Sequence, residues 1–145
     1  NSMGYLPMET AAQGSSKLSR PIPFQTVARG SRSGIRESLQ AVARSQTEWE
    51  TLWQKHVSSQ SSPPSLPAVD FSNEIVVAIF PGENPTGGHG VEIIGVDSGD
   101  GAVTVSFAEK GPRPGDMQIQ AFTQPFHIVR IVNHRGEEVR FRRVS

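Results

Sequence analysis

The chain has 145 residues, with 14 acidic and 14 basic side chains, so its formal net charge at pH 7 is zero. This balance disfavours a nucleic-acid or acidic-membrane binder, which needs an excess of positive charge. The absence of cysteine excludes disulfides, thiolate catalysis and zinc–thiolate sites. The 14 glycines and 11 prolines indicate many turns, as in all-β or α+β domains.

The N-terminal segment differs in character from the rest of the chain. Residues 1–20 are small, polar and aperiodic, and we expect a disordered tail there. The functional alternative is a tether that follows a signal peptide or a lipid anchor. Residues 21–145 are of the length expected for a single globular domain.

The next segment, Ile35–Ala43, alternates without a purely apolar face. This pattern indicates a half-exposed or edge strand, although its helix-forming residues leave a helix open. A helix is then predicted from Ser45, because Ser45 and Glu48 have the spacing of a capping box. An apolar stripe at helical spacing follows: Trp49, Leu52, Trp53 and Val57. We interpret the stripe as core packed against a sheet.

The second half of the chain has the patterns of β-strands. Short runs rich in Val and Ile predict buried strands, and alternating runs predict half-exposed ones: Ile75–Phe80, Val91–Val96, Ala102–Phe107, Met117–Thr123, Phe126–Val132 and Val139–Val144. The runs before and after Gln124-Pro125 are either two strands or one bent strand. With about seven strands and one helix, the expected class is α+β: a mainly antiparallel sheet, sandwich- or barrel-like, with the helix packed on it.

The connection between the two buried strands is unusual. Pro81–Gly90 contains four glycines and two prolines, far more than a minimal hairpin needs. It is no phosphate-binding loop, because Gly88 and His89 stand where lysine and a hydroxyl residue are required. Pro85 blocks glycosylation at Asn84. The loop is therefore either a contact surface or only the way the fold turns this corner.

No arrangement of residues indicates catalysis or metal binding. The four histidines do not occur at metal-ligand spacing, and no Gly-x-Ser-x-Gly elbow is present. His127 lies in an apolar strand and is interpreted as structural. The C-terminal basic cluster is interpreted as a solvated strand face: Arg130, Arg135, Arg140, Arg142 and Arg143. We expect no enzymatic activity, no catalytic residue, no metal and no cofactor.

Three segments together resemble one family. Residues 78–93, AIFPGENPTGGHGVEI, are similar to FxGExPTGGYxVEI, the signature of the PrcB C-terminal domain family. Pro114-Gly115 and residues 123–131, TQPFHIVRI, resemble later elements of that family. Residues 45–53, SQTEWETLW, resemble the helix that often precedes them. The likeness spans about Val27 to Val132, and His89 stands where the family commonly has tyrosine.

The resemblance carries expectations about function. The family is named for a subunit of a bacterial surface protease complex that is needed for assembly and stability of a subtilisin-like protease. It therefore implies a non-enzymatic, extracytoplasmic binding protein of the periplasm or cell surface, often a lipoprotein, whose partner is a protein such as a secreted protease. No nucleic-acid partner and no membrane span are expected. The candidate contact residues are Gly82, Glu83, Asn84, Pro85, Thr86, Gly87, Gly88 and His89.

Two other functions remain open. Residues 84–87 also resemble the Asn-Pro-Thr-Thr-Gly loop of chagasin-like cysteine-protease inhibitors, in which a loop between strands enters the protease cleft. The first alternative is thus a protease inhibitor that presents this loop. The second is a small-ligand or carbohydrate-binding domain, which would require Trp49 or Trp53 to be exposed.

Overall fold

The computed structural model describes residues 19–115, 120–132 and 137–144. Within them the chain forms eight strands and one helix. The strands are β1 (Arg20–Pro21), β2 (Phe24–Gly30), β3 (Leu39–Ala43), β4 (Glu74–Phe80), β5 (Gly90–Gly99), β6 (Ala102–Lys110), β7 (Phe126–Val132) and β8 (Glu138–Arg143), and the helix is α1 (Gln46–His56). The expected α+β class is confirmed.

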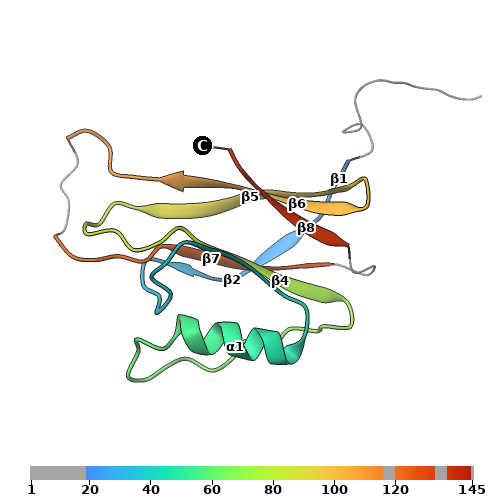
Figure 1. Ribbon diagram of the computed structural model, residues 1–145, viewed down its shortest axis with the longest axis horizontal. Helices are drawn as coiled ribbons and strands as arrows, with labels where there is room; N and C mark the ends of the chain where they lie inside the picture. The colour runs from blue at the N-terminus through green and yellow to red at the C-terminus, as the bar shows by residue number, and fades with distance from the viewer. Residues whose placement is uncertain (1–18, 116–119, 133–136, 145) are drawn as a thin grey trace, which may run out of the picture.

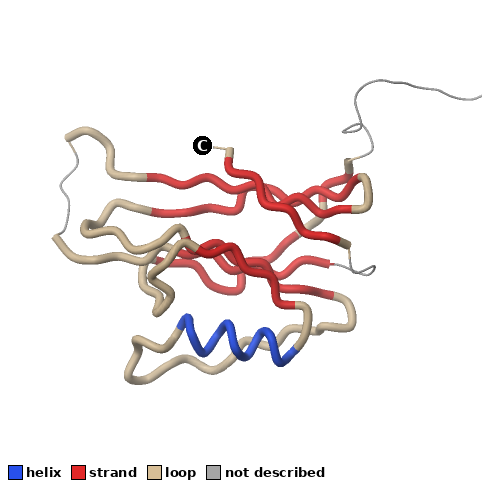
Figure 2. The backbone as a smooth tube through the Cα atoms, in the orientation of Figure 1, coloured by secondary structure: helices blue, strands red, loops and turns tan. Residues whose placement is uncertain are grey.

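The strands form two open sheets that face each other (Figures 1 and 2). One sheet has the order β1-β5-β6-β8 and the other β2-β7-β4-β3. We call them the upper and the lower sheet, after their places in Figure 1. The sandwich alternative is therefore correct and the closed barrel is wrong. Helix α1 covers the outer face of the lower sheet, so the molecule has three layers and two cores.

Strand β4 belongs to both cores. Its odd-numbered residues, such as Val77, pack between the two sheets, whereas its even-numbered residues, such as Ala78, pack beneath the helix. A strand with two buried faces needs apolar residues at every position. This explains why Ile75–Phe80 forms an uninterrupted apolar run, each residue of which is buried.

Helix α1 begins as the capping motif predicts. The Ser45 hydroxyl accepts a hydrogen bond from the Glu48 amide at 3.2 Å. The Glu48 carboxylate accepts one from the Arg44 amide at 2.7 Å, one residue earlier than in a standard capping box. The predicted stripe of Trp49, Leu52, Trp53 and Val57 is buried against the lower sheet, as expected.

The structure corrects several details of the sequence interpretation. Only Leu39–Ala43 of the segment 35–43 is a strand, and it is an edge strand, so the helical alternative is wrong. Residues 120–123 form no strand, and a single bridge joins Thr123 to Asn84; residues 116–119 lie outside the described part. Strand β8 pairs with β6 in parallel. Strand β7 lies between them in the sequence but belongs to the other sheet, so the chain crosses from the upper to the lower sheet after β6 and returns after β7.

Two further expectations concern the termini and the membrane. Residues 1–18 of the expected tail lie outside the described residues, and Arg20 at its end pairs with Ser98 of β5. No helix in the described part of the chain combines the length and the apolar character needed to cross a membrane.

Candidate functional site

Three connections meet at one end of the sandwich, on the left in Figure 1. They are the β2–β3 connection (31–38), the β4–β5 loop (81–89) and the described parts of the β6–β7 connection (111–115 and 120–125). We call them together the loop end. All eight candidate contact residues, 82–89, lie in the middle connection, and hydrogen bonds join it to both neighbours.

Two glycines give the β4–β5 loop its shape. Gly82 has a φ of +116° and Gly88 a φ of +84°, which are conformations that side-chain-bearing residues rarely adopt. At Gly88 a Cβ atom would also lie 3.1 Å from Cγ of Pro112 in the neighbouring connection. These glycines therefore serve the local backbone and the contact between connections.

The backbone of the loop is bonded to both neighbouring connections. The Glu83 amide donates to the Arg36 carbonyl at 2.8 Å. Asn84 and Thr123 exchange two backbone hydrogen bonds of 2.8 Å each. The Thr123 hydroxyl also donates to the Thr86 carbonyl at 2.8 Å. The loop is thus held from both sides.

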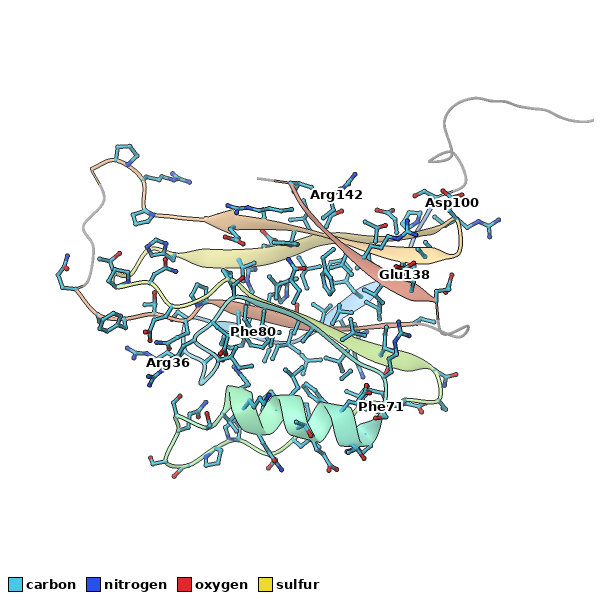
Figure 3. The ribbon with its side chains drawn as sticks, in the orientation of Figure 1. Arg36, Phe71, Phe80, Asp100, Glu138 and Arg142 are labelled. Carbon is cyan, nitrogen blue, oxygen red and sulfur yellow. The ribbon has the colours of Figure 1, made fainter. Side chains whose placement is uncertain are left out.

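Gln124 joins all three connections, although the sequence did not single it out as a site residue. Its amide donates to the Ser31 carbonyl at 2.8 Å, and its Oε1 accepts from the Ser33 amide at 3.3 Å. Its Nε2 donates to a Glu83 carboxylate oxygen at 2.7 Å. The same oxygen lies 3.8 Å from Nε of Arg36. Figure 3 shows the place of Arg36 at this end of the molecule. The sequence offered one signal for Gln124, which is that it lies in the segment TQPFHIVRI that resembles a later element of the family.

The candidate residues differ in what they offer to a partner. Glu83, Pro85 and Gly88 are exposed, whereas the other five are partly buried. The His89 ring turns to its own loop, with Nε2 3.2 Å from the Thr86 hydroxyl. Near the loop, Phe122 is 61% exposed. The sequence did not indicate Phe122, because no local pattern distinguishes an exposed apolar residue from a buried one.

His127 has the structural role expected of it. It is 3% exposed, and its Nδ1 accepts the Ile93 amide of the opposite sheet at 2.9 Å. The proton must therefore be on Nε2, which donates to the Thr26 hydroxyl at 2.8 Å. Burial, with a smaller effect of the nearby Arg29 charge, lowers the His127 pKa to about 4. A neutral imidazole thus links the two sheets.

His56 and Ser33 form a second buried polar pair. His56 Nδ1 lies 2.9 Å from the Ser33 hydroxyl, which also accepts the Ile35 amide at 3.0 Å. The His56 ring lies against Phe126 and Trp53, with ring centroids 4.2 and 5.2 Å away. Burial lowers the His56 pKa to about 4. Both members are almost fully buried, so the pair ties the β2–β3 connection to α1 and does not present a nucleophile.

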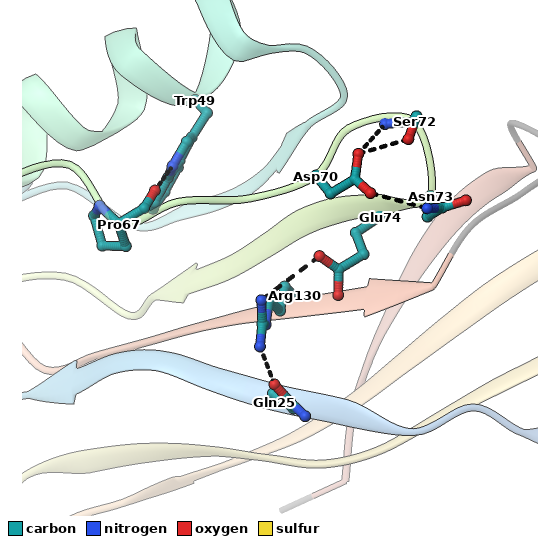
Figure 4. A network of polar contacts seen from close by, with 8 residues as sticks. All are labelled: Gln25, Trp49, Pro67, Asp70, Ser72, Asn73, Glu74 and Arg130. Carbon is teal, nitrogen blue, oxygen red and sulfur yellow. Dashed lines mark hydrogen bonds and ion pairs between the residues drawn. The ribbon is translucent and has the colours of Figure 1, made fainter.

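The tryptophans offer no platform for a ligand. Trp49 is fully buried and Trp53 is 7% exposed. Their indole nitrogens donate to the carbonyls of Pro67 and Pro64, at 2.9 and 3.2 Å (Figure 4 shows the first). The ligand-binding alternative required one of them to be exposed, and this requirement is not met.

The basic cluster consists largely of paired side chains. Arg130 lies between Glu74, at 3.7 Å, and Gln25 (Figure 4). Arg140 pairs with Glu138 at 3.2 Å, and Arg142 donates to the Ser106 hydroxyl at 3.2 Å. Arg143 pairs with Glu109 at 3.6 Å, whereas Arg135 lies outside the described residues. This pairing is consistent with a solvated strand face.

Chemistry elsewhere in the described residues is sparse. No group of three or more potential metal-ligating side chains occurs among residues 19–115, 120–132 and 137–144. A depression of about 690 Å³ lies at the opposite end of the sandwich, lined by β1, the β5–β6 turn, Val132 and Glu137. The loop end therefore remains the best candidate site.

Comparison with known proteins found one family. Residues 75–132 match the family model described as PrcB C-terminal, which confirms the resemblance over that segment. No curated protein and no solved structure matches the chain. The matched segment runs from β4 to the end of β7 and contains both the glycine-rich loop and the Thr123-Gln124 pair that holds it.

Proposed function

We propose, from the match of residues 75–132 to the PrcB C-terminal family, that this protein is a non-enzymatic accessory subunit of a protease complex. In this role it binds a secreted protease and assists its assembly or stability. The family match is the observation that carries the proposal. It associates the chain with a protease-complex subunit, and protein–protein association is the activity that follows.

The loop end supports the proposal as the contact surface. Its three connections are cross-bonded through Glu83, Asn84, Thr123 and Gln124. A surface that is already ordered loses little conformational entropy when a partner binds. Residues 82–89 are accordingly proposed as part of the contact, with Pro85 and Gly88 as the most accessible positions besides Glu83.

The same contacts favour an accessory role over substrate-like inhibition. An inhibitor segment that lies in a protease cleft as an added strand uses its own free backbone groups. Here the amides of Glu83 and Asn84 and the carbonyls of Asn84 and Thr86 already bond within the molecule. We therefore propose that the loop docks on a surface of the protease and does not occupy its active site.

The proposed function requires export, so we also propose an extracytoplasmic location, with a lipid anchor or signal peptide encoded upstream. Fractionation of cells that express the complete gene tests this. Recovery of the protein in the cytoplasmic fraction alone would overturn the proposed location.

The function is tested with purified subtilisin-like proteases encoded in the same genome. We expect the protein to co-elute with one of them in size-exclusion chromatography and to lengthen its half-life at growth temperature. Cleavage of a small peptide substrate should continue at an unchanged rate. Inhibition of peptide cleavage would point to the inhibitor function instead, and failure to bind any of these proteases would refute the accessory role.

A further inference from the structure

The most exposed large apolar side chain at the loop end is Phe122, at 61%. Scattered single apolar residues are normal on protein surfaces, and Ile94 and Val144 are of that kind here. Phe122 differs from them in its surroundings. It directly precedes Thr123 and Gln124, the two residues that hold the three connections together.

The bridge between Asn84 and Thr123 places Phe122 opposite Pro85. The two chains run antiparallel there, so the residue before Thr123 lies across from the residue after Asn84. Pro85 is itself exposed. Two exposed apolar residues, one from each connection, thus lie at the same end of this bridge inside the candidate site.

The backbone that carries Phe122 is fixed on its C-terminal side. Thr123 has backbone bonds of 2.8 Å in both directions to Asn84, and Gln124 bonds to the β2–β3 connection. Pro125 is buried after them. An aromatic side chain on an ordered backbone has few rotatable bonds to immobilise, which is typical of residues that dominate binding energy.

The charges around Phe122 are nearly balanced. The described residues of the three connections contain Arg32, Arg36 and Arg113 against Glu37 and Glu83, three positive and two negative, a net charge of +1. Glu83 and Arg36 also lie close to each other. Such a surface gives little electrostatic attraction to a nucleic acid or an anionic lipid surface, and the exposed phenyl ring of Phe122 fits a protein pocket better.

We propose that Phe122, with Pro85 beside it, is the anchor through which the loop end binds its protein partner. The partner presents an apolar pocket that receives the phenyl ring, and the polar groups of residues 82–89 form the rim of the contact. This inference rests on the proposed function and identifies the residue that supplies most of the affinity. It shifts the centre of the contact from the glycine-rich loop to the neighbouring connection.

The experiment measures binding of the protein to the purified subtilisin-like proteases of the same genome by biolayer interferometry. We expect Phe122→Ala to weaken binding by at least about tenfold, mainly through faster dissociation, and Phe122→Leu to have an intermediate effect. Ile94→Ala is the matched control, because Ile94 is 50% exposed and lies in β5, outside the loop end. Circular dichroism verifies that every variant is folded.

The possible results separate the inference from the proposed function. Binding by wild type with a Phe122→Ala affinity within about twofold would overturn the anchor and leave the accessory function intact. If wild type binds none of the proteases, the proposed function fails and the anchor with it. A parallel measurement uses phosphatidylglycerol–phosphatidylethanolamine vesicles, and binding there that depends on Phe122 would replace the protein partner with a lipid surface.

Discussion

Gly82 shows at the level of one residue how a sequence can require a particular loop. Its φ of +116° costs little for glycine, whereas a residue with a Cβ atom is strained there. Gly90, in the same glycine-rich segment, has open space around its Cβ position and an ordinary φ. The glycines of this loop are therefore not equivalent.

We expect Gly82→Ala to lower the free energy of unfolding by about 1–3 kcal/mol, because the backbone strain remains in the folded state. Gly90→Ala is the matched control and should change it by less than about 0.5 kcal/mol. Urea denaturation measures both. Equal losses for the two variants would mean that the backbone conformation at Gly82 is not what requires glycine.

The two buried histidines make stability depend on pH. Burial lowers the pKa of His56 and of His127 from 6.5 to about 4. Between pH 4 and pH 6.5 the unfolded chain binds more protons than the folded protein does. The contribution of the neutral histidines to the free energy of unfolding is therefore fully present above pH 6.5 and is lost as the pH decreases towards 4. Asp70, whose pKa is lowered by hydrogen bonds from Ser72 and Asn73 (Figure 4), titrates below this range.

Wild type should lose on the order of 2 kcal/mol of unfolding free energy per histidine between about pH 7 and about pH 5. His127→Gln keeps a donor and an acceptor in the side chain but cannot titrate. Its pH dependence should be roughly half that of wild type. Urea denaturation at the two pH values tests this, and the same pH dependence in both proteins would contradict the assignment.

Helix α1 illustrates how local and tertiary effects combine in one element. Its start is determined by the Ser45 cap, and its buried stripe by the contact with the lower sheet. The two indole N–H groups then bond to Pro64 and Pro67 and attach the following connection to the helix. The helix thus organises the chain on its own side of the molecule.

Replacing Ser45 tests whether its N-cap stabilises helix α1. Ser45→Ala removes the acceptor for the Glu48 amide and should destabilise the protein by about 1 kcal/mol. Thr47→Ala is the control, because Thr47 is exposed in the first turn. Thermal denaturation should show a lower midpoint for Ser45→Ala only. An equal effect of both changes would indicate that helix propensity and not the cap is responsible.

At the scale of the whole molecule, the lower sheet joins the two cores. Strands β4 and β7 contribute Val77 and Val129 to one core and Ala78 and Ile128 to the other. Loss of either core would expose one face of these strands. The layers should therefore unfold together.

Tryptophan fluorescence reports the helix layer, and far-ultraviolet circular dichroism reports mainly the sheets. We expect both signals to change in one coincident urea transition, with the slowest amide hydrogen exchange in β4 and β7. A fluorescence change at lower urea than the circular dichroism change would mean that α1 separates from the sandwich first.

Much of this architecture could be predicted because its signals are local in the chain. The cap at Ser45, the stripe of Trp49 and its neighbours, and the apolar runs of β4 and β5 depend on periodicity within a few residues. The role of His127 was also predictable from its apolar strand. The family resemblance, which the match of residues 75–132 confirms, was visible for the same reason, since the residues of its signature are contiguous.

The contacts that define the loop end were not predictable in this way. Gln124 bonds to Ser31, 93 positions earlier, and the Thr123 hydroxyl to Thr86, 37 positions earlier. The sequence by itself determined the helix, the strand content and the glycines that shape the loop, because each depends on neighbouring residues. Only the tertiary structure decided the two-sheet arrangement, the parallel pairing of β8, and the exposure of Phe122 next to the bridge between Asn84 and Thr123. These depend on which distant segments meet, and no local pattern encodes that choice.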